Sequence, residues 1–246
     1  MVVIDDVDHL DQATAAALVR LVEGDRARLL ATRRSTSPAP ATVAALWREA
    51  GVARVDLGPL GEDDVAEILR GALGAGIDGR TLTVLGDLAA GSPLLLRELT
   101  TASLDAGTLV REQGLWRLLG PPTLTPEVSD RASTELAAVD AAGRAALELL
   151  ALAGPLPAGL ADELVPGPVL EQLERAGLVG PGPGLLDQGD TAAEAMVTVT
   201  SPVVAEWLRR ALPRTARRRL SLALAEASKQ ASVVSPDLEL RTVVWR

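Results

Sequence analysis

The stretch MVVIDDVDHLD (residues 1–11) sets the expected fold of the N-terminal part of the chain, because its apolar run ends in two adjacent carboxylates. Val2 to Ile4 is apolar at every position, which is typical of a strand buried on both faces in a parallel sheet. Behind it, Asp11 can cap a helix over residues 12–23 that Gly24 can end. The stretch therefore predicts a strand followed by a helix.

The residues that follow continue this alternation. ARLLATRR (27–34) predicts a second buried strand, and the composition of STSPAPAT (35–42) predicts a loop. A short helix around Trp47 and a third strand at ARVDLGPL (53–60) are expected next. Strand, helix, strand, helix and strand in this order are typical of a parallel α/β sheet.

The middle of the chain is predicted to be helical. GEDDVAEILRGALG (61–74) carries its apolar residues on one stripe and three carboxylates in its first turn, where the helix dipole favours negative charge. Two more helices are expected at 80–90 and 93–106. TLVREQGLWRLLG (108–120) has Gln113-Gly114 between two short runs that contain apolar residues, which predicts a small hairpin.

The second half of the chain has a different pattern. Pro121, Pro122 and Pro126 predict a linker, and a loose Gly/Pro-rich loop leads to the strand-like run MVTVTSP (196–202). Three helices followed by two strands that such a loop joins indicate a winged-helix domain. The helices expected in this half lie at 132–153, 159–164, 167–176 and 203–231.

The composition excludes several classes of protein. The 246 residues include no cysteine, so disulfides and thiolate metal sites are excluded, and the single histidine, His9, is interpreted as structural. No run of about 18 apolar residues is present, which predicts a soluble cytoplasmic protein without a membrane partner. Residues 205–246 carry nine basic and four acidic side chains, a balance of +5. The remaining residues carry a balance of −14, and the two together give the net charge of −9. An acidic body of this kind repels a nucleic-acid backbone.

Asp5 and Asp6 are the first candidate site residues. In an open parallel sheet, ligands bind beyond the carboxyl ends of the strands, which is where carboxylates directly after an apolar strand would lie. Mg²⁺ is usually held by one or two carboxylates together with substrate phosphates, and a neighbouring acid can orient water. The structural alternative is a polar strand end before a capped helix, and the residues alone leave both interpretations open.

Two further positions carry the same ambiguity. Arg33 follows the second strand and could sense a γ-phosphate from the same crevice, whereas Arg34 beside it is interpreted as a solvated side chain. Gly91-Ser92-Pro93 can be explained without any ligand. Gly91 can end one helix, Ser92 can cap the next, and Pro93 can take its first position.

DNA binding through the winged helix is a less favoured alternative. Its expected recognition helix, PVLEQLERAG (168–177), carries two Glu and one Arg, which is unfavourable for contact with phosphates. The cluster Arg217–Arg219 is interpreted as a solvated helix face. We therefore favour a scaffolding role for this domain.

Several segments, in order and at natural distances, resemble the large ATP-binding LuxR-type transcriptional regulators of actinobacteria. These regulators are STAND-class NTPases of the AAA+ lineage. The resemblance covers nearly the whole chain, and its specificity lies in the order and spacing of motifs that are weak one by one. The segments are VVIDDVDHLD, RLLATRRS, LWREAG, LGPL, GSPLLLREL, GTLVREQGLWR, LELLALAGPLP, LERAGLVG and SPVVAEWLRRALPRTARRRLSLALAEA.

The resemblance implies roles for the residues at the predicted strand ends. Asp5 would be the magnesium ligand of the Walker B strand, and Asp6 would be its catalytic acidic neighbour. Arg33 would occupy the sensor-1 position. The cofactors implied for the complete protein are ATP or ADP with Mg²⁺.

The resemblance also covers the helical middle and the winged helix. Gly91 and Pro93 would belong to the lid motif that packs on the adenine, usually written G-N-P, with Ser92 in place of the Asn. Ser201-Pro202 falls where His-Pro is common in the family. The loss of that His argues against a contact from the winged helix to the nucleotide.

The largest departure from the family is the phosphate loop, G-x-x-x-x-G-K-[ST]. Lys229 is the only lysine, and no G-K dipeptide occurs. DLELRTVVWR (237–246) resembles the entry into the family's helical repeats, and no helix-turn-helix for DNA follows. We therefore expect a segment whose partners are the remaining domains of a parent regulator or other subunits. ATP is expected to bind weakly or not at all to this chain alone, without measurable hydrolysis.

The expected fold is mainly α with a partial α/β part. Its domains, in order, are a truncated P-loop NTPase core (1–60), a helical lid with a small hairpin (61–120), a linker (121–139), a winged-helix domain (140–204) and helices that lead into a repeat domain (205–246).

Three functions stay open on the sequence. They are a nucleotide-switch segment of a transcription regulator, a protein-interaction module that has lost nucleotide chemistry, and direct DNA binding. A phosphate loop in the coding DNA just upstream of Met1 would favour the first function over the second. Without partner strands for the sheet, the apolar edge at Val2 to Ile4 would be exposed and would invite association.

Overall fold

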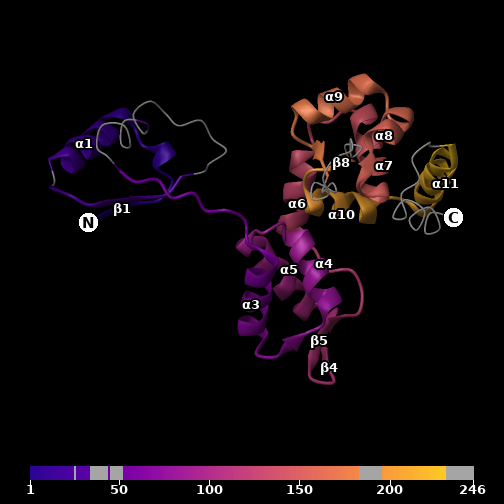
Figure 1. Ribbon diagram of the computed structural model, residues 1–246, viewed down its shortest axis with the longest axis horizontal. Helices are drawn as coiled ribbons and strands as arrows, with labels where there is room; N and C mark the ends of the chain where they lie inside the picture. The colour runs from indigo at the N-terminus through magenta and orange to yellow at the C-terminus, as the bar shows by residue number, and fades with distance from the viewer. Residues whose placement is uncertain (25, 34–43, 45–51, 183–195, 231–246) are drawn as a thin grey trace, which may run out of the picture. The chain divides into compact units, whose positions relative to one another are not determined.

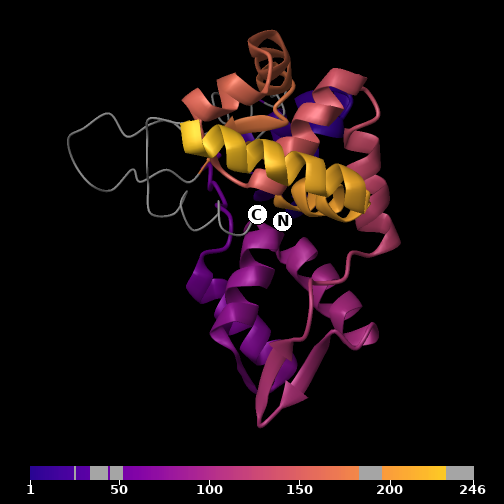
Figure 2. The ribbon, with the colours of Figure 1, turned by 90° about the vertical axis from the view of Figure 1, so that its right-hand side faces the viewer.

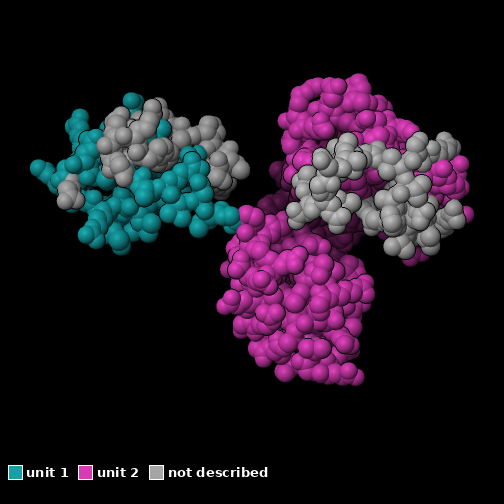
Figure 3. Space-filling model, in the orientation of Figure 1, with its two compact units in different colours: residues 1–58 teal, residues 59–246 magenta. Residues whose placement is uncertain are grey.

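The computed structural model divides the chain into two compact units, Met1–Gly58 and Pro59–Arg246 (Figure 1, the turned view in Figure 2, and Figure 3). The structure describes residues 1–24, 26–33, 44, 52–182 and 196–230. Over these residues the chain is mainly helical with three small sheets, which agrees with the expected mainly α fold with a partial α/β part. No helix among them has both the length and the apolar character needed to cross a membrane. The described residues exclude Arg34, the predicted loop at 35–42, the predicted helix around Trp47 and the predicted entry into helical repeats at 237–246.

Unit 1 is built on two short parallel strands, β1 (Val2–Ile4) and β2 (Leu29–Ala31). Between them the chain forms a short 3₁₀ helix, η1 (Val7–His9), and the helix α1 (Gln12–Glu23). The predicted helix and the first two predicted strands are therefore confirmed, although both strands are short. The buried core of this unit consists of Val7, Leu18 and Val19, with partly buried residues of both strands packed against it.

The prediction that β1 is buried on both faces is wrong. Val3 is 62% exposed and its register partner Leu30 is 59% exposed. The neighbouring positions Val2 and Ile4 pack against the core that α1 closes, because successive side chains of a strand point to opposite faces. Among the described residues, α1 covers one face of this two-stranded sheet, and Val3 and Leu30 lie on the other.

The third strand expected at 53–60 is not formed. These residues lie outside any helix or strand, and the side chains of Val55 and Leu57 are exposed. The strand prediction is therefore wrong here, because a strand also requires a hydrogen-bonded partner. Pro59 has no N–H to donate to a ladder, and the chain passes here from unit 1 into unit 2.

Three helices form the first part of unit 2 and confirm the helices predicted from the sequence. They are α3 (Glu62–Leu73), α4 (Gly79–Ala89) and α5 (Pro93–Asp105). Their apolar stripes meet in one core, here called the first core, whose buried residues are Val65, Leu69, Leu85, Leu88, Ala89, Leu96, Leu99, Val128 and Val203.

The predicted hairpin is also confirmed. Its strands β4 (Leu109–Glu112) and β5 (Leu115–Leu118) are antiparallel, and a third strand that the sequence analysis missed, β3 (Gly76–Ile77), pairs with β5 in parallel. At the turn, Gln113 has a φ of 51° and Gly114 a φ of 85°. Two successive residues with positive φ match the two-residue hairpin turn in which Gly is favoured. Figure 2 shows the hairpin at the end of this part of unit 2.

The segment expected as a linker, 121–139, is largely helical. Residues Pro126–Glu135 form α6, with Thr125 as the N-cap and Pro126 in the first position. Proline is favoured at that position because its missing N–H has no partner in the first helical turn in any case. Val128 lies in the first core, whereas Ala132 lies in a second core formed by the C-terminal half of the unit. The helix predicted at 132–153 is accordingly two helices, α6 and α7 (Ala141–Ala153).

The C-terminal half of unit 2 packs around the second core. Antiparallel pairing gives a three-stranded sheet in the order β6-β8-β7. The helix expected at 203–231 is broken at Pro213 into α10 and α11, and α11 lies against α7 and α8 (Figure 2). The bounds in this half, besides α7, are β6 (Leu156–Pro157), α8 (Ala158–Leu164), α9 (Gly167–Arg175), β7 (Val179–Pro181), β8 (Met196–Val199), α10 (Pro202–Ala211) and α11 (Arg214–Gln230).

Candidate nucleotide-site residues and a pocket in unit 2

Asp5 and Asp6 lie directly after β1, at the same end of the sheet as Thr32, which follows β2. The hydroxyl of Thr32 donates a hydrogen bond to Oδ1 of Asp5 at 2.5 Å, and the backbone N–H of Asp6 donates to the Thr32 hydroxyl oxygen at 3.0 Å. The backbone of Thr32 is bonded on both sides, from its own N–H to the Ile4 carbonyl and from the Val7 N–H to its carbonyl. Thr32 therefore fixes the position of the Asp5 carboxylate.

The backbone at Asp6 turns the chain away from the strand. Its φ of 51° lies in the left-handed region, which Asp tolerates better than most residues with a side chain. The 3₁₀ helix η1 begins at the next residue and carries Asp8. As a result, Asp5 is exposed at the sheet end and Asp6 is half-buried.

Arg33 forms an ion pair with Asp8, with Nε and Oδ1 3.5 Å apart. The two side chains are only 20% and 13% exposed, so the pair is better shielded from solvent than most surface ion pairs. The sequence analysis assigned a role to Arg33 but none to Asp8 or Thr32. The parallel register of the two strands would have identified Thr32, because pairing Ile4 with Ala31 places the next residues, Asp5 and Thr32, opposite each other.

The donor set at this sheet end fits one side of a magnesium–phosphate site. Asp5 offers an exposed carboxylate, and Mg²⁺ commonly takes one or two carboxylates with phosphate oxygens and water as its other ligands. Within the described ranges, no three or more His, Cys, Asp or Glu side chains converge to hold a metal on their own. Any magnesium here would depend on phosphate oxygens for most of its coordination.

The Gly91-Ser92-Pro93 motif lies in unit 2, between α4 and α5. Gly91 has a φ of 72°, and its carbonyl accepts a hydrogen bond from the Leu60 N–H at 2.9 Å. A Cβ at position 91 would lie 2.4 Å from the Cβ of Pro59, which no side chain allows. The Ser92 hydroxyl accepts from the Leu95 N–H at 3.3 Å, and Pro93 begins α5. Packing and capping thus account for all three residues.

The structure also places three other features named from the sequence: His9, Ser201 and the expected recognition helix. His9 is exposed at the end of η1, and Ser201 caps α10 through a hydrogen bond from the Val204 N–H at 3.4 Å. On α9, the expected recognition helix, Glu171 pairs with Arg175 at 2.8 Å. Arg175, the basic residue of α9, is therefore paired within its own helix.

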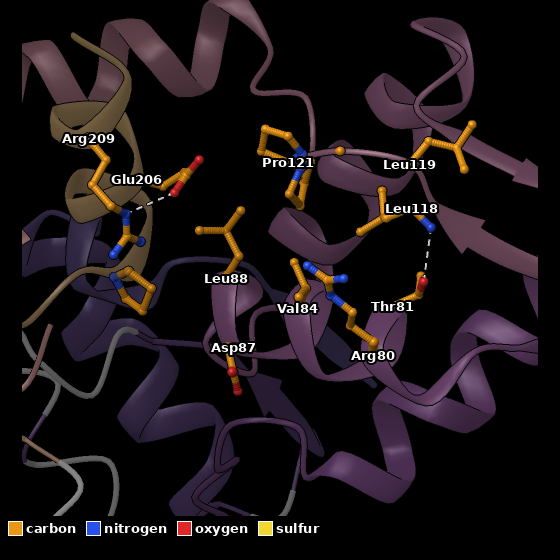
Figure 4. A pocket seen from close by; sticks show the side chains of 13 residues that line it. Arg80, Thr81, Val84, Asp87, Leu88, Leu118, Leu119, Pro121, Glu206 and Arg209 are labelled. Carbon is orange, nitrogen blue, oxygen red and sulfur yellow. Dashed lines mark hydrogen bonds and ion pairs between the residues drawn. The ribbon is translucent and has the colours of Figure 1, made fainter. Parts of the chain in front are cut away.

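Unit 2 contains a pocket that the sequence analysis did not identify (Figure 4). Its volume is about 510 Å³, and three segments line it: one face of α4, the end of β5 with the residues that follow it, and one face of α10. Because these segments are far apart in the sequence, no local motif could have indicated it. The lining residues are Arg80, Thr81, Val84, Asp87, Leu88, Leu118, Leu119, Gly120, Pro121, Pro122, Pro202, Glu206 and Arg209.

Neither a search against models of known protein families nor a search of curated proteins finds a match to this chain.

Proposed function

We propose that this chain is the nucleotide-switch segment of a LuxR-type ATP-binding transcriptional regulator of the STAND class. The observation that carries the proposal is the Asp5–Thr32 hydrogen bond at the carboxyl ends of two adjacent parallel strands. Ligands of open α/β sheets bind at this end, and an exposed, oriented carboxylate there suits a magnesium ion bound to phosphates.

Each residue at this edge has a distinct proposed role. Asp5 would hold Mg²⁺ and Thr32 would position its carboxylate, while Asp6 would be the acidic neighbour that orients water. Arg33 would sense the γ-phosphate, and its ion pair with Asp8 would have to loosen for that contact. Bound Mg²⁺ would neutralise the repulsion between these carboxylates and the phosphates.

The topology of residues 141–199 supports a winged-helix domain in the same regulator. The elements follow the order helix, strand, helix, helix, strand, strand, and the sheet order is β6-β8-β7. Because its candidate recognition helix α9 carries Glu171 and Glu174, we assign this domain a scaffolding role rather than DNA contact.

The affinity of the chain for ATP should be low. Phosphate loops bind through backbone N–H groups and a lysine, and the only lysine here, Lys229, lies on α11. Isothermal titration of the chain with ATP and Mg²⁺ tests this expectation. We expect no saturation in the micromolar range; a micromolar dissociation constant, equivalent to about −8 kcal/mol, would contradict it.

The alternative is a protein-interaction module that has lost nucleotide chemistry. Two observations favour it: packing alone accounts for Gly91, and the apolar Val3 and Leu30 are exposed side by side. The two functions differ in their dependence on magnesium. A switch segment should show weak ATP binding that requires Mg²⁺ and is lost in Asp5→Asn, whereas an interaction module should show none in either protein.

A further inference from the structure

We propose that the pocket between α4, residues 118–122 and α10, here called the α4–α10 pocket, binds a small amphipathic carboxylate. The class intended is a molecule with an apolar body and a single negative charge. The pocket lies wholly in unit 2 and includes none of the residues assigned to the nucleotide. Its volume of about 510 Å³ falls in the range of small-molecule sites.

Apolar side chains line the pocket on all three segments. Val84 and Leu88 lie one turn apart on α4, and the rings of Pro121 and Pro202 come from the other two segments. Prolines have few conformations to lose when a ligand packs against them, so their contribution to binding carries little entropic cost. An aliphatic or aromatic body would therefore be partly desolvated between α4 and α10.

Arg80 provides the positive charge. It precedes Val84 by one helical turn and lines the same pocket (Figure 4), and within the described ranges its guanidinium makes no ion pair or hydrogen bond. A guanidinium presents a planar pair of N–H donors that matches the two oxygens of a carboxylate. The unpaired Arg80 therefore defines the end of the pocket at which the anionic group would sit.

The acidic residues limit the ligand to one negative charge. The carboxylate of Glu206, on the α10 side, is already paired with Arg209 at 3.0 Å and with Arg210 at 2.8 Å. Asp87 lines the pocket on the α4 side and is exposed. A dianion such as a phosphate monoester would meet repulsion from Asp87, whereas a monoanion can be matched by Arg80 alone.

The walls of the pocket are held in place before any ligand binds. Arg209 donates a hydrogen bond to the Ala151 carbonyl at 3.1 Å, and Arg210 donates one to the Pro122 carbonyl. On the opposite side, the Leu118 N–H donates to the Thr81 hydroxyl at 3.0 Å, as Figure 4 shows. A preformed pocket binds without paying for the ordering of its walls.

A bound carboxylate would also stabilise the contact between the two halves of unit 2. α4 belongs to the first core, whereas α10 contributes Val203 to the first core and Leu208 to the second. A ligand that contacts α4 and α10 together would therefore favour the arrangement in which both cores share α10. We expect it to raise the thermal midpoint of the whole chain.

Octanoate is a suitable probe, and the experiment uses the full chain. NMR titration should show saturable shifts of the methyl groups of Val84, Leu88 and Leu118. Arg80→Gln should weaken octanoate binding by about tenfold, the effect of losing one charged hydrogen-bonded partner. The matched control is Arg70→Gln, an exposed arginine on α3 outside the pocket, which should leave the affinity unchanged.

Two further measurements separate charge recognition from apolar adsorption. Octanol, which has the same body without the charge, should bind more weakly than octanoate and equally to both variants. Octyl phosphate should bind more weakly than octanoate because of its second charge. Non-saturable shifts, shifts outside the pocket, or equal octanoate affinities for the Arg80→Gln and Arg70→Gln proteins would overturn the proposal.

Discussion

At the scale of single residues, Thr32 joins the ends of the two strands of unit 1 through four hydrogen bonds. The Thr32 hydroxyl accepts a hydrogen bond from the Asp6 N–H and donates one to the Asp5 carboxylate. The Thr32 N–H donates to the Ile4 carbonyl, and the Thr32 carbonyl accepts from the Val7 N–H. Thr32→Val should weaken this sheet end by about 1 kcal/mol, because two polar groups lose their partner at a solvent-accessible site. Hydrogen exchange of the β1 and β2 amides, followed by NMR, measures the effect.

Thr32→Ser is the matched control for this substitution, since it keeps the hydroxyl and removes only a methyl group. The serine protein should exchange at a rate close to the wild type. If the valine and serine proteins exchange alike, the hydroxyl does not hold the two aspartates and the role assigned to Thr32 is wrong.

Gly91 allows a sharper test, because strain and steric contact can be separated there. Gly91→Ala would add a Cβ in left-handed backbone and 2.4 Å from Pro59, so we expect unit 2 to lose about 3 kcal/mol of stability. Gly107→Ala has the same kind of backbone, with a φ of 66°, and open space around it. It should cost about 1 kcal/mol. Urea unfolding followed by circular dichroism measures both, and equal losses would show that the contact with Pro59–Leu60 is unimportant.

At the scale of elements, α1 depends on its cap. Asp11 accepts hydrogen bonds from the Thr14 hydroxyl at 2.6 Å and from the N–H groups of Thr14 and Ala13. These bonds, that from the Thr14 side chain first, lower the pKa of Asp11 below its ordinary value. A lowered folded-state pKa adds stability above the unfolded-state pKa, and this stability is lost as the pH falls through the folded-state value.

We therefore expect the helix signal of unit 1 to weaken on acidification below about pH 4, as Asp11 takes up a proton. Asp11→Ala should lower the stability of α1 at neutral pH and remove this part of the pH dependence. Hydrogen exchange of the α1 amides at several pH values measures it. A pH profile that is the same in both proteins would show that another group is responsible.

The helices and strands also show which structural features local sequence patterns can predict. The helices at 62–73, 79–89 and 93–105 were predicted because apolar periodicity and caps are local properties. Residues 53–60 were predicted as a strand and form none, because pairing depends on a partner that the local pattern cannot specify. The start of the helix Pro126–Glu135 was missed because Pro126 was interpreted as part of a linker rather than as the first residue of a helix.

The candidate site was predictable to a similar extent. Asp5, Asp6 and Arg33 could be placed at strand ends, since two apolar runs precede them. The ion pair between Arg33 and Asp8 depends on the left-handed turn at Asp6, which the sequence does not indicate. The α4–α10 pocket brings together residues more than a hundred positions apart, so local sequence patterns could not predict it.

At the scale of the whole molecule, the open face of the β1–β2 sheet should govern association. Val3 and Leu30 are register partners with exposed side chains, and an exposed apolar sheet face invites contact with another chain. We expect the chain to self-associate with rising concentration and the double variant Val3→Thr, Leu30→Thr to do so less. Light scattering at several concentrations measures this.

A matched control is Leu222→Thr, which removes a single apolar side chain, 54% exposed, from α11. It should leave the association unchanged. A wild-type chain that stays monomeric at every concentration would contradict the prediction, as would equal effects of the control and the double variant.

The central claim is that Asp5, Asp6 and Thr32 form one side of a magnesium–nucleotide site whose phosphate loop these residues do not supply. The most direct test is NMR of the 25.5 kDa chain titrated with ATP to millimolar concentration, with Mg²⁺ and with EDTA. We predict shifts of the Asp5, Asp6 and Thr32 amides that require Mg²⁺, approach saturation only in the millimolar range and disappear in Asp5→Asn. Absence of these shifts, shifts that are independent of Mg²⁺ or Asp5, or saturation at micromolar ATP would contradict the account.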